Sequence, residues 1–159
     1  MFMILPFESI ADCSDEDHYC RRTNLGVLRH QTKAMSGDGY SHITLDDVEI
    51  YKSKSSYITF LYDDLGYMKN GKYFITKTVI SSVPWTPCHH LEFRGHCIVN
   101  AVLDFSGDKL IISNDFISDT GQDNVDWVSW GKANSIIVFT DGSKFKYANG
   151  RVERVIDKK

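Results

Sequence analysis

The chain has 159 residues, enough for one domain with a core of its own, and carries a formal net charge of −3. Hydrophobic residues make up 42% and charged residues 25%, a balance typical of globular rather than disordered chains. The small negative charge excludes a general attraction to nucleic acid and argues against a nucleic-acid partner. No apolar run approaches the length of a membrane span, which argues against a membrane partner as well.

The start of the chain and its cysteines bear on the compartment. Residues 1–7 are apolar but have no basic leader and soon meet acidic residues, so we expect no export signal. The four cysteines, Cys13, Cys20, Cys88 and Cys97, are enough for two disulfides. Without an export signal, reduced thiols are the better interpretation. These features together predict a cytoplasmic protein.

The first half of the chain predicts short strands separated by polar turns. Ser14, followed three residues later by Asp17, resembles a capping box and predicts a short helix within residues 14–22, with a solvated loop as the alternative. Asn70-Gly71 between two aromatic segments predicts a hairpin. Alternating or β-branched patterns predict further strands over residues 26–35, 40–50, 57–62 and 78–83.

The last third of the chain gives the clearest architectural signal. Asp141-Gly142 and Asn149-Gly150 separate three short apolar or alternating segments between residues 135 and 156. Both dipeptides tolerate the positive φ that two-residue hairpin turns require, so we predict a three-stranded antiparallel meander. Upstream, residues 98–105 and 110–113 predict a hairpin, and residues 125–130 predict a strand with a kink.

The predicted fold is therefore mainly β. Nine to eleven short strands, at the ~8–12 residue spacing of all-β folds, indicate an antiparallel sandwich or strongly bent sheet. We expect at most one short helix near the N-terminus and a single domain over residues 1–159. A β-propeller is the alternative, but it needs at least four blades of ~40 residues and the first half shows no matching period.

The segment from Cys88 to Cys97 concentrates two Cys and three His with a Glu and an Arg. Thiolate and imidazole are zinc ligands, so Cys88, His90, His96 and Cys97 are candidate metal ligands, although their spacing matches no familiar zinc motif. The same residues could serve a small enzyme as a nucleophile–base pair. No Gly-x-Ser-x-Gly, P-loop or dinucleotide motif supports catalysis, so we expect neither an enzyme nor a cofactor.

A run of aspartates stands beside two tryptophans. Residues 98–142 carry seven Asp against two Lys, whereas residues 143–159 are net basic. Aromatic anchors with a carboxylate rim fit a surface that binds a basic protein partner. The order of oxygen ligands that a calcium loop needs is absent. The candidate partner-binding residues are Asp115, Asp119, Asp123, Asp126, Trp127 and Trp130.

Basic residues on the last two predicted strands form a second charged pattern. Lys144 and Lys146 alternate with Phe145 and Tyr147, which predicts a strand with one cationic and one apolar face. Contact with RNA is one interpretation, but plain solvent exposure explains the same residues.

In general character the chain resembles bacterial immunity proteins of toxin–immunity pairs, such as those of contact-dependent growth inhibition. Such proteins are small, unexported, mildly acidic and rich in aromatic residues, and they carry no catalytic signature. The resemblance implies a non-enzymatic cytoplasmic module that binds and neutralises a cognate toxin domain, often a nuclease with a basic active site. Residues 115–126 would then mimic phosphates and block that site.

Overall fold

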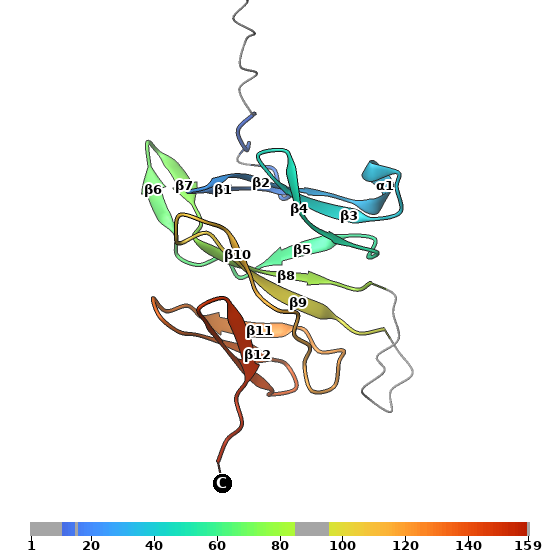
Figure 1. The fold of residues 1–159 in the computed structure, drawn as a ribbon, viewed down its shortest axis with the longest axis vertical. Coiled ribbons are helices and arrows are strands. Elements are labelled where there is room, and N and C mark those ends of the chain that lie inside the picture. Colours follow the sequence, from blue (N-terminus) through green and yellow to red (C-terminus); the bar gives the residue numbers. More distant parts are fainter. Residues whose placement is uncertain (1–10, 15, 85–95, 159) are drawn as a thin grey trace, which may run out of the picture.

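The computed structural model describes residues 11–14, 16–84 and 96–158. It contains three four-stranded antiparallel sheets, stacked as layers in Figure 1, and a separate two-stranded hairpin. The first sheet contains, in order, β1 (Cys20–Thr23), β2 (Gly26–Gln31), β3 (Ser41–Leu45) and β4 (Val48–Ser53). The middle sheet contains β5 (Ile58–Leu61), β8 (Lys77–Ser82), β9 (Val99–Asp104) and β10 (Ile111–Ile112). The third sheet contains β11 (Val125–Ser129), β12 (Ser135–Phe139), β13 (Lys144–Ala148) and β14 (Arg151–Arg154), and the hairpin is β6 (Tyr67–Lys69) with β7 (Lys72–Phe74).

The middle sheet is buried on both faces, which explains the apolar runs of its two central strands. Side chains alternate across a strand, so Val79 and Val102 pack into the core shared with the third sheet. Ile80 and Leu103 point the other way, into the core shared with the first sheet. Two hydrophobic cores therefore hold three layers together.

The outer sheets bury one face each, as the alternating pattern of the last strands predicts. Phe145 and Tyr147 of β13 are buried in the core below the middle sheet, whereas Lys146 is exposed. The cationic outer face is thus confirmed as an exposed sheet surface. The predicted kink is also present, because the β11–β12 register shifts between Val125 and Trp127.

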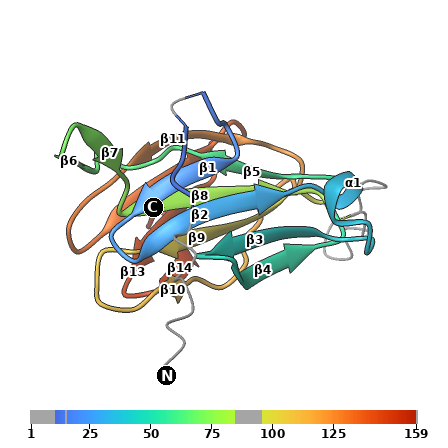
Figure 2. The same ribbon diagram turned by 90° about the horizontal axis from the view of Figure 1, so that it is seen from above.

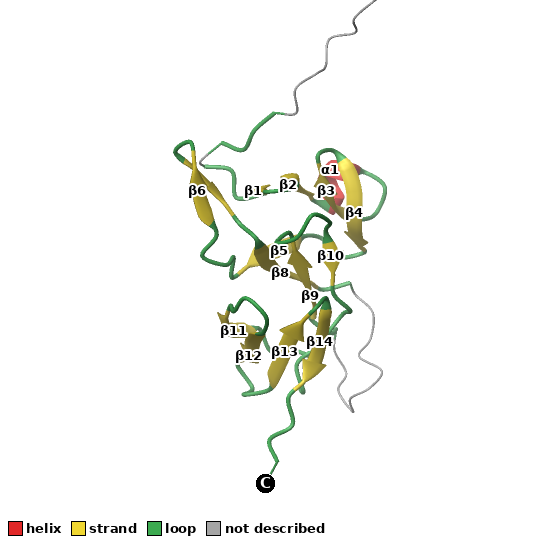
Figure 3. Ribbon diagram, turned by 60° about the vertical axis from the view of Figure 1, so that its left-hand side comes forward, coloured by secondary structure: helices red, strands yellow, loops and turns green. Residues whose placement is uncertain are grey.

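The hairpin β6–β7 is an insertion between β5 and β8, and Figure 3 shows it standing beside the stack. Its turn is the predicted Asn70-Gly71, where both residues have positive φ. Tyr67 stacks on Phe74 across the hairpin with ring centroids 5.4 Å apart. The Ile75 N–H donates to the Arg22 carbonyl at 2.9 Å, which anchors the hairpin base to β1.

The mainly β prediction is confirmed, with fourteen strands in the described residues where nine to eleven were expected. One reason is the segment 40–50, which is a hairpin rather than one strand, because Asp46 and Asp47 both adopt positive φ. The helix predicted within residues 14–22 is wrong, since β1 begins at Cys20 and pairs with β2. The helix is instead α1 (Lys33–Ser36), capped by the Thr32 side chain.

The prediction of reduced thiols is also wrong. Cys13 and Cys20 form a disulfide, and Cys97 is disulfide-bonded too, so none of the described cysteines is free. The bond between Cys13 and Cys20 closes the segment in which the helix was predicted. Within the described residues, no helix has the length and apolar character needed to cross a membrane.

Candidate protein-binding surface

Three of the four predicted aspartates lie on the connection between β10 and β11, where two of them make internal bonds. The Asp119 carboxylate accepts two hydrogen bonds from Arg154, Nε to Oδ1 at 2.8 Å and Nη2 to Oδ2 at 2.5 Å. Asp123 accepts from the hydroxyls of Thr120 and Thr140, the latter at 2.6 Å. These bonds attach the connection to the third sheet and leave both carboxylates less available to a partner.

The other two predicted aspartates lie far apart on the stack. The Asp115 charge acts on Tyr51 of β4: burial, with this charge as a second cause, raises the pKa of Tyr51 to about 12. Asp126 is exposed on β11, and Figure 2 shows β4 and β11 on opposite sides of the stack. The structure therefore does not bring the four aspartates onto one acidic face.

The two predicted tryptophans have different roles. Trp127 of β11 is 45% exposed. Trp130 is half-buried against the core between the middle and third sheets, and its Nε1 donates to the Tyr62 carbonyl at 2.7 Å. Only Trp127 is thus placed as an exposed anchor, and Trp130 holds the loop after β5 against the third sheet.

The structure assembles a surface that the sequence did not predict. The first strand of each sheet, namely β1, β5 and β11, lies on the same side of the stack in Figure 2, and the β6–β7 hairpin lies on that side too. Every exposed Tyr, Trp or Phe of the described residues is in or next to one of these strands or that hairpin. We call this surface the aromatic edge, and it comprises Tyr19, Tyr57, Tyr62, Tyr67, Tyr73 and Trp127.

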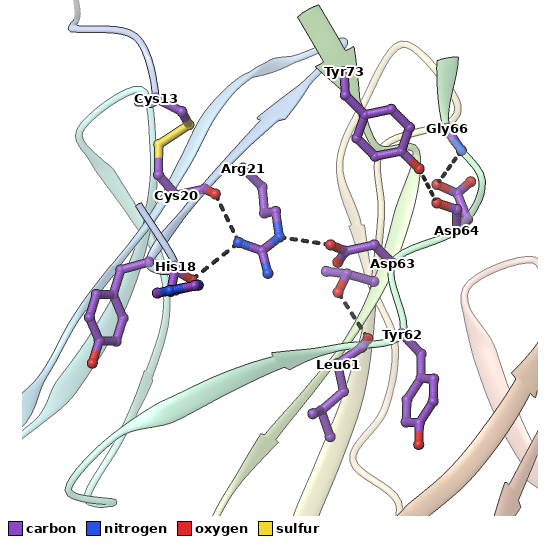
Figure 4. A network of polar contacts seen from close by, with 12 residues as sticks. Cys13, His18, Cys20, Arg21, Leu61, Tyr62, Asp63, Asp64, Gly66 and Tyr73 are labelled. Carbon is purple, nitrogen blue, oxygen red and sulfur yellow. Dashed lines mark hydrogen bonds and ion pairs between the residues drawn. A yellow bond between two sulfur atoms is a disulfide. The ribbon is translucent and has the colours of Figure 1, made fainter. Parts of the chain in front are cut away.

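A network around Arg21 fixes one part of the aromatic edge (Figure 4). Its Nε donates to Asp63 at 2.7 Å, and its Nη1 donates to the carbonyls of His18 and Cys20 at 3.1 and 2.9 Å. The guanidinium also lies over the Phe60 ring, 5.3 Å from its centroid. Arg21 therefore joins the disulfide-closed segment to the loop that follows β5.

Tyr62 fixes a second part of the aromatic edge. Its φ of 50° is rare for a bulky residue and persists only where surrounding contacts hold it. Its hydroxyl donates to the carbonyls of Val125 and Asp126 at 3.1 and 2.6 Å, in addition to the bond that its own carbonyl accepts from Trp130. The ring therefore spans the middle and third sheets in one orientation.

The β6–β7 hairpin is held in place by Asp64, which follows β5. Asp64 accepts from the backbone N–H of Thr76 at 2.9 Å and of Gly66 at 3.2 Å, and its carbonyl accepts from the Tyr73 hydroxyl at 2.6 Å (Figure 4). A preorganised aromatic surface loses little conformational entropy on binding, which favours its use as an interface.

Two grooves border β5 within this surface. One, of about 340 Å³, separates β5 from β1 and is lined by Arg21 and Phe60 among others. The other, of about 270 Å³, lies toward the third sheet and is lined by Leu61 and Asn124. Tyr57 and Thr59 border both grooves, so β5 forms the ridge between them.

The predicted metal site is only partly covered by the described residues. Cys88 and His90 fall outside the described residues. Cys97 is disulfide-bonded and has no thiolate for a metal, while His96 is exposed. The part of the chain that the structure describes contains no group of three or more His, Cys, Asp or Glu placed to hold a metal ion.

Comparisons with protein-family models, curated proteins and solved structures find no match to this chain. The surface must therefore be interpreted from its own geometry. Trp127 is predictable from the aspartates beside it in the sequence. The five tyrosines are not, because they come from separated segments, and only the aromatic-rich composition indicates an interface.

Proposed function

We propose that this chain is a non-enzymatic protein-binding module whose contact surface is the aromatic edge. The observation that carries the proposal is that all exposed aromatic side chains of the described residues gather on one side of the stack. Tyrosine and tryptophan are enriched in protein interfaces and at their energetic hot spots, since they bury a large area at a low entropy cost. Exposed apolar residues that are scattered singly are normal on monomeric proteins, whereas clustered ones mark interaction sites.

Within that class, we propose the role of an immunity protein that binds a cognate toxin domain and blocks its active site. The general resemblance to such proteins supports this role. The contact differs from the acidic face expected from the sequence, because Asp119 and Asp123 are engaged within the chain. Asp126, exposed beside Trp127, is the predicted acidic residue that remains on the proposed surface and could steer a basic partner.

The disulfide bears on where the partner is met. The cytoplasmic location expected from the sequence assumed reduced thiols, and the bond between Cys13 and Cys20 removes that assumption. Disulfides persist mainly in oxidising compartments. We therefore favour an encounter in such a compartment over one in the cytoplasm.

Photo-crosslinking in the host cell tests the proposal. We would replace Tyr57 or Trp127 by a photoreactive phenylalanine derivative and use Val48 as the matched control, because Val48 is also exposed but lies on β4, on the opposite side. We expect both edge positions to crosslink the same protein and the control to crosslink none. Co-expression should then abolish growth inhibition by that protein. Crosslinks from Val48 alone, or from no position, would contradict the proposal.

A further inference from the structure

We infer that β5 is a docking strand, which an extended segment of the partner protein extends by antiparallel or parallel pairing at its free edge. The inference rests on the proposed function, since it says how the aromatic edge binds. It starts from the backbone of β5 rather than from its aromatic neighbours.

The hydrogen-bond alternation identifies which groups of β5 are free. The Phe105 N–H donates to the Thr76 carbonyl, so every second residue of β8 counted from Thr76 bonds with β9. The intervening residues Val79 and Ser81 direct their backbone N–H and C=O groups to β5. Their register partners there are Leu61 and Thr59.

The backbone N–H and C=O groups of the remaining β5 residues, Ile58 and Phe60, therefore point away from β8. The Ile58 N–H agrees with this, because it donates to Nε2 of His30 at 3.0 Å instead of to the sheet. The N–H and C=O of Phe60 and the C=O of Ile58 have no partner among the described residues. Such a row of unpaired groups is a template for another strand.

Three of the other five edges of the four-stranded sheets are closed by specific contacts. On β1, the carbonyls of Arg22 and Cys20 accept from the Ile75 N–H and from the Arg21 side chain. On β11, the Tyr62 hydroxyl caps two carbonyls. On β14, the Asn114 side chain bonds both the N–H and the C=O of Val152, at 2.8 and 3.0 Å.

The last two edges have other protection. β4 carries Glu49 and Lys52, and charged side chains on an edge discourage pairing. β10 has two residues, too few for a stable pairing. In contrast, β5 has four residues, none of them charged, and beyond the Ile58 N–H its outward backbone groups meet none of these devices. Natural sheets protect such edges unless they use them, which singles out β5 as the docking strand.

The two grooves define the segment that fits. A strand added beside β5 would send alternate side chains to opposite faces of the middle sheet, hence alternately toward the two grooves. Arg21 is the one Asp, Glu, Lys or Arg residue among their lining residues, and Asp63 already pairs with it. The occupant is therefore an extended segment of about four residues with uncharged side chains, rather than an acidic or basic one.

A backbone substitution tests this without altering a side chain. Incorporating the α-hydroxy analogue of phenylalanine at position 60 replaces the Phe60 N–H by an ester oxygen. The probe is a displayed random peptide library selected against the unaltered protein. We expect selected peptides to share an uncharged alternating core and to bind the ester variant about three- to tenfold more weakly, the effect of one lost hydrogen bond.

A second variant keeps the test decisive if the ester reduces folding. Thr59→Lys places a charge between the two grooves and should abolish peptide binding, whereas Val48→Lys on β4 should not. Thermal unfolding checks that each variant is folded. Peptides that bind both edge variants normally, or a library that yields no peptide, would overturn the inference. So would a dimer of this chain that Thr59→Lys dissociates, because β5 would then pair with a second copy.

The two proposals fail differently. If Tyr57 and Trp127 crosslink one partner that binds the ester and Thr59→Lys variants as tightly as the unaltered protein, the aromatic edge stands and the docking strand is refuted. If peptides pair with β5 but no protein crosslinks in the cell, the edge is available and the proposed function is refuted.

Discussion

The bond between Tyr147 and Asp104 gives the sharpest test of how the layers are joined. The Tyr147 hydroxyl, from the third sheet, donates to Oδ2 of Asp104 in the middle sheet at 2.5 Å, and the two residues are 3% and 8% exposed. Tyr147→Phe removes only this hydroxyl. Hydrogen bonds to charged groups contribute about 1.5–3 kcal/mol. Because Asp104 keeps its bonds from Ser106, we expect a loss of about 2 kcal/mol in unfolding free energy.

The loss should depend on pH in a defined direction. Burial raises the pKa of Asp104, but hydrogen bonds from Ser106 and Tyr147 and the charge of Lys77 outweigh it, so the pKa is lowered. A carboxyl whose pKa is lower in the folded state stabilises the fold above its unfolded pKa, about 3.9, and loses that contribution as pH falls through the folded value. The penalty of Tyr147→Phe should therefore be full at neutral pH and shrink below about pH 4.

Urea unfolding at neutral and at acidic pH measures this penalty. Tyr73→Phe is the matched control, since the Tyr73 hydroxyl donates to a backbone carbonyl and its loss should cost about 0.5–1.5 kcal/mol. A penalty for Tyr147→Phe that is below the control, or unchanged across the pH range, would refute the role assigned to Asp104.

Three further predictions concern the edges and the disulfide. Cys13→Ser with Cys20→Ser should lower the unfolding free energy by about 2.5 kcal/mol for so short a loop, measured by urea unfolding without a reductant so that the disulfide of Cys97 stays intact. Asn114→Ala removes the cap of the β14 edge, so it should cost about 1–2 kcal/mol and cause concentration-dependent association in analytical ultracentrifugation. Arg154→Ala breaks the exposed pair with Asp119 and should cost less than about 1 kcal/mol in a urea titration, increasingly less with added salt.

Local signals explain which parts of the fold were predictable. Asn149-Gly150 and Asn70-Gly71 adopt the positive φ that their hairpins need, so turn chemistry alone located the four strands β6, β7, β13 and β14. Asp46-Asp47 makes the same kind of turn with residues that tolerate it less often, and the segment was therefore interpreted as one strand. The helix prediction failed because pairing of β1 with β2 outweighed a capping pattern.

The binding surface was less predictable because it depends on contacts between distant residues. Nothing near Asp119 in the sequence indicates that Arg154, thirty-five positions later, engages it. The tyrosines before and after β5 meet Trp127 only because the sheets stack with their first strands on one side. The sequence indicates the residue types of an interface, whereas their position depends on how the layers stack.

The pattern of edge protection links the fold to its proposed use. Closing β14 requires one asparagine from a loop, and closing β11 requires a tyrosine in a strained conformation. Such devices cost little in sequence, so a third one at β5 would have been equally accessible. Instead, the same Tyr62 that caps β11 leaves Phe60 uncovered two residues earlier. The residues that close the neighbouring edges thus define the limits of the open one, which is the arrangement expected if β5 is kept free for a partner.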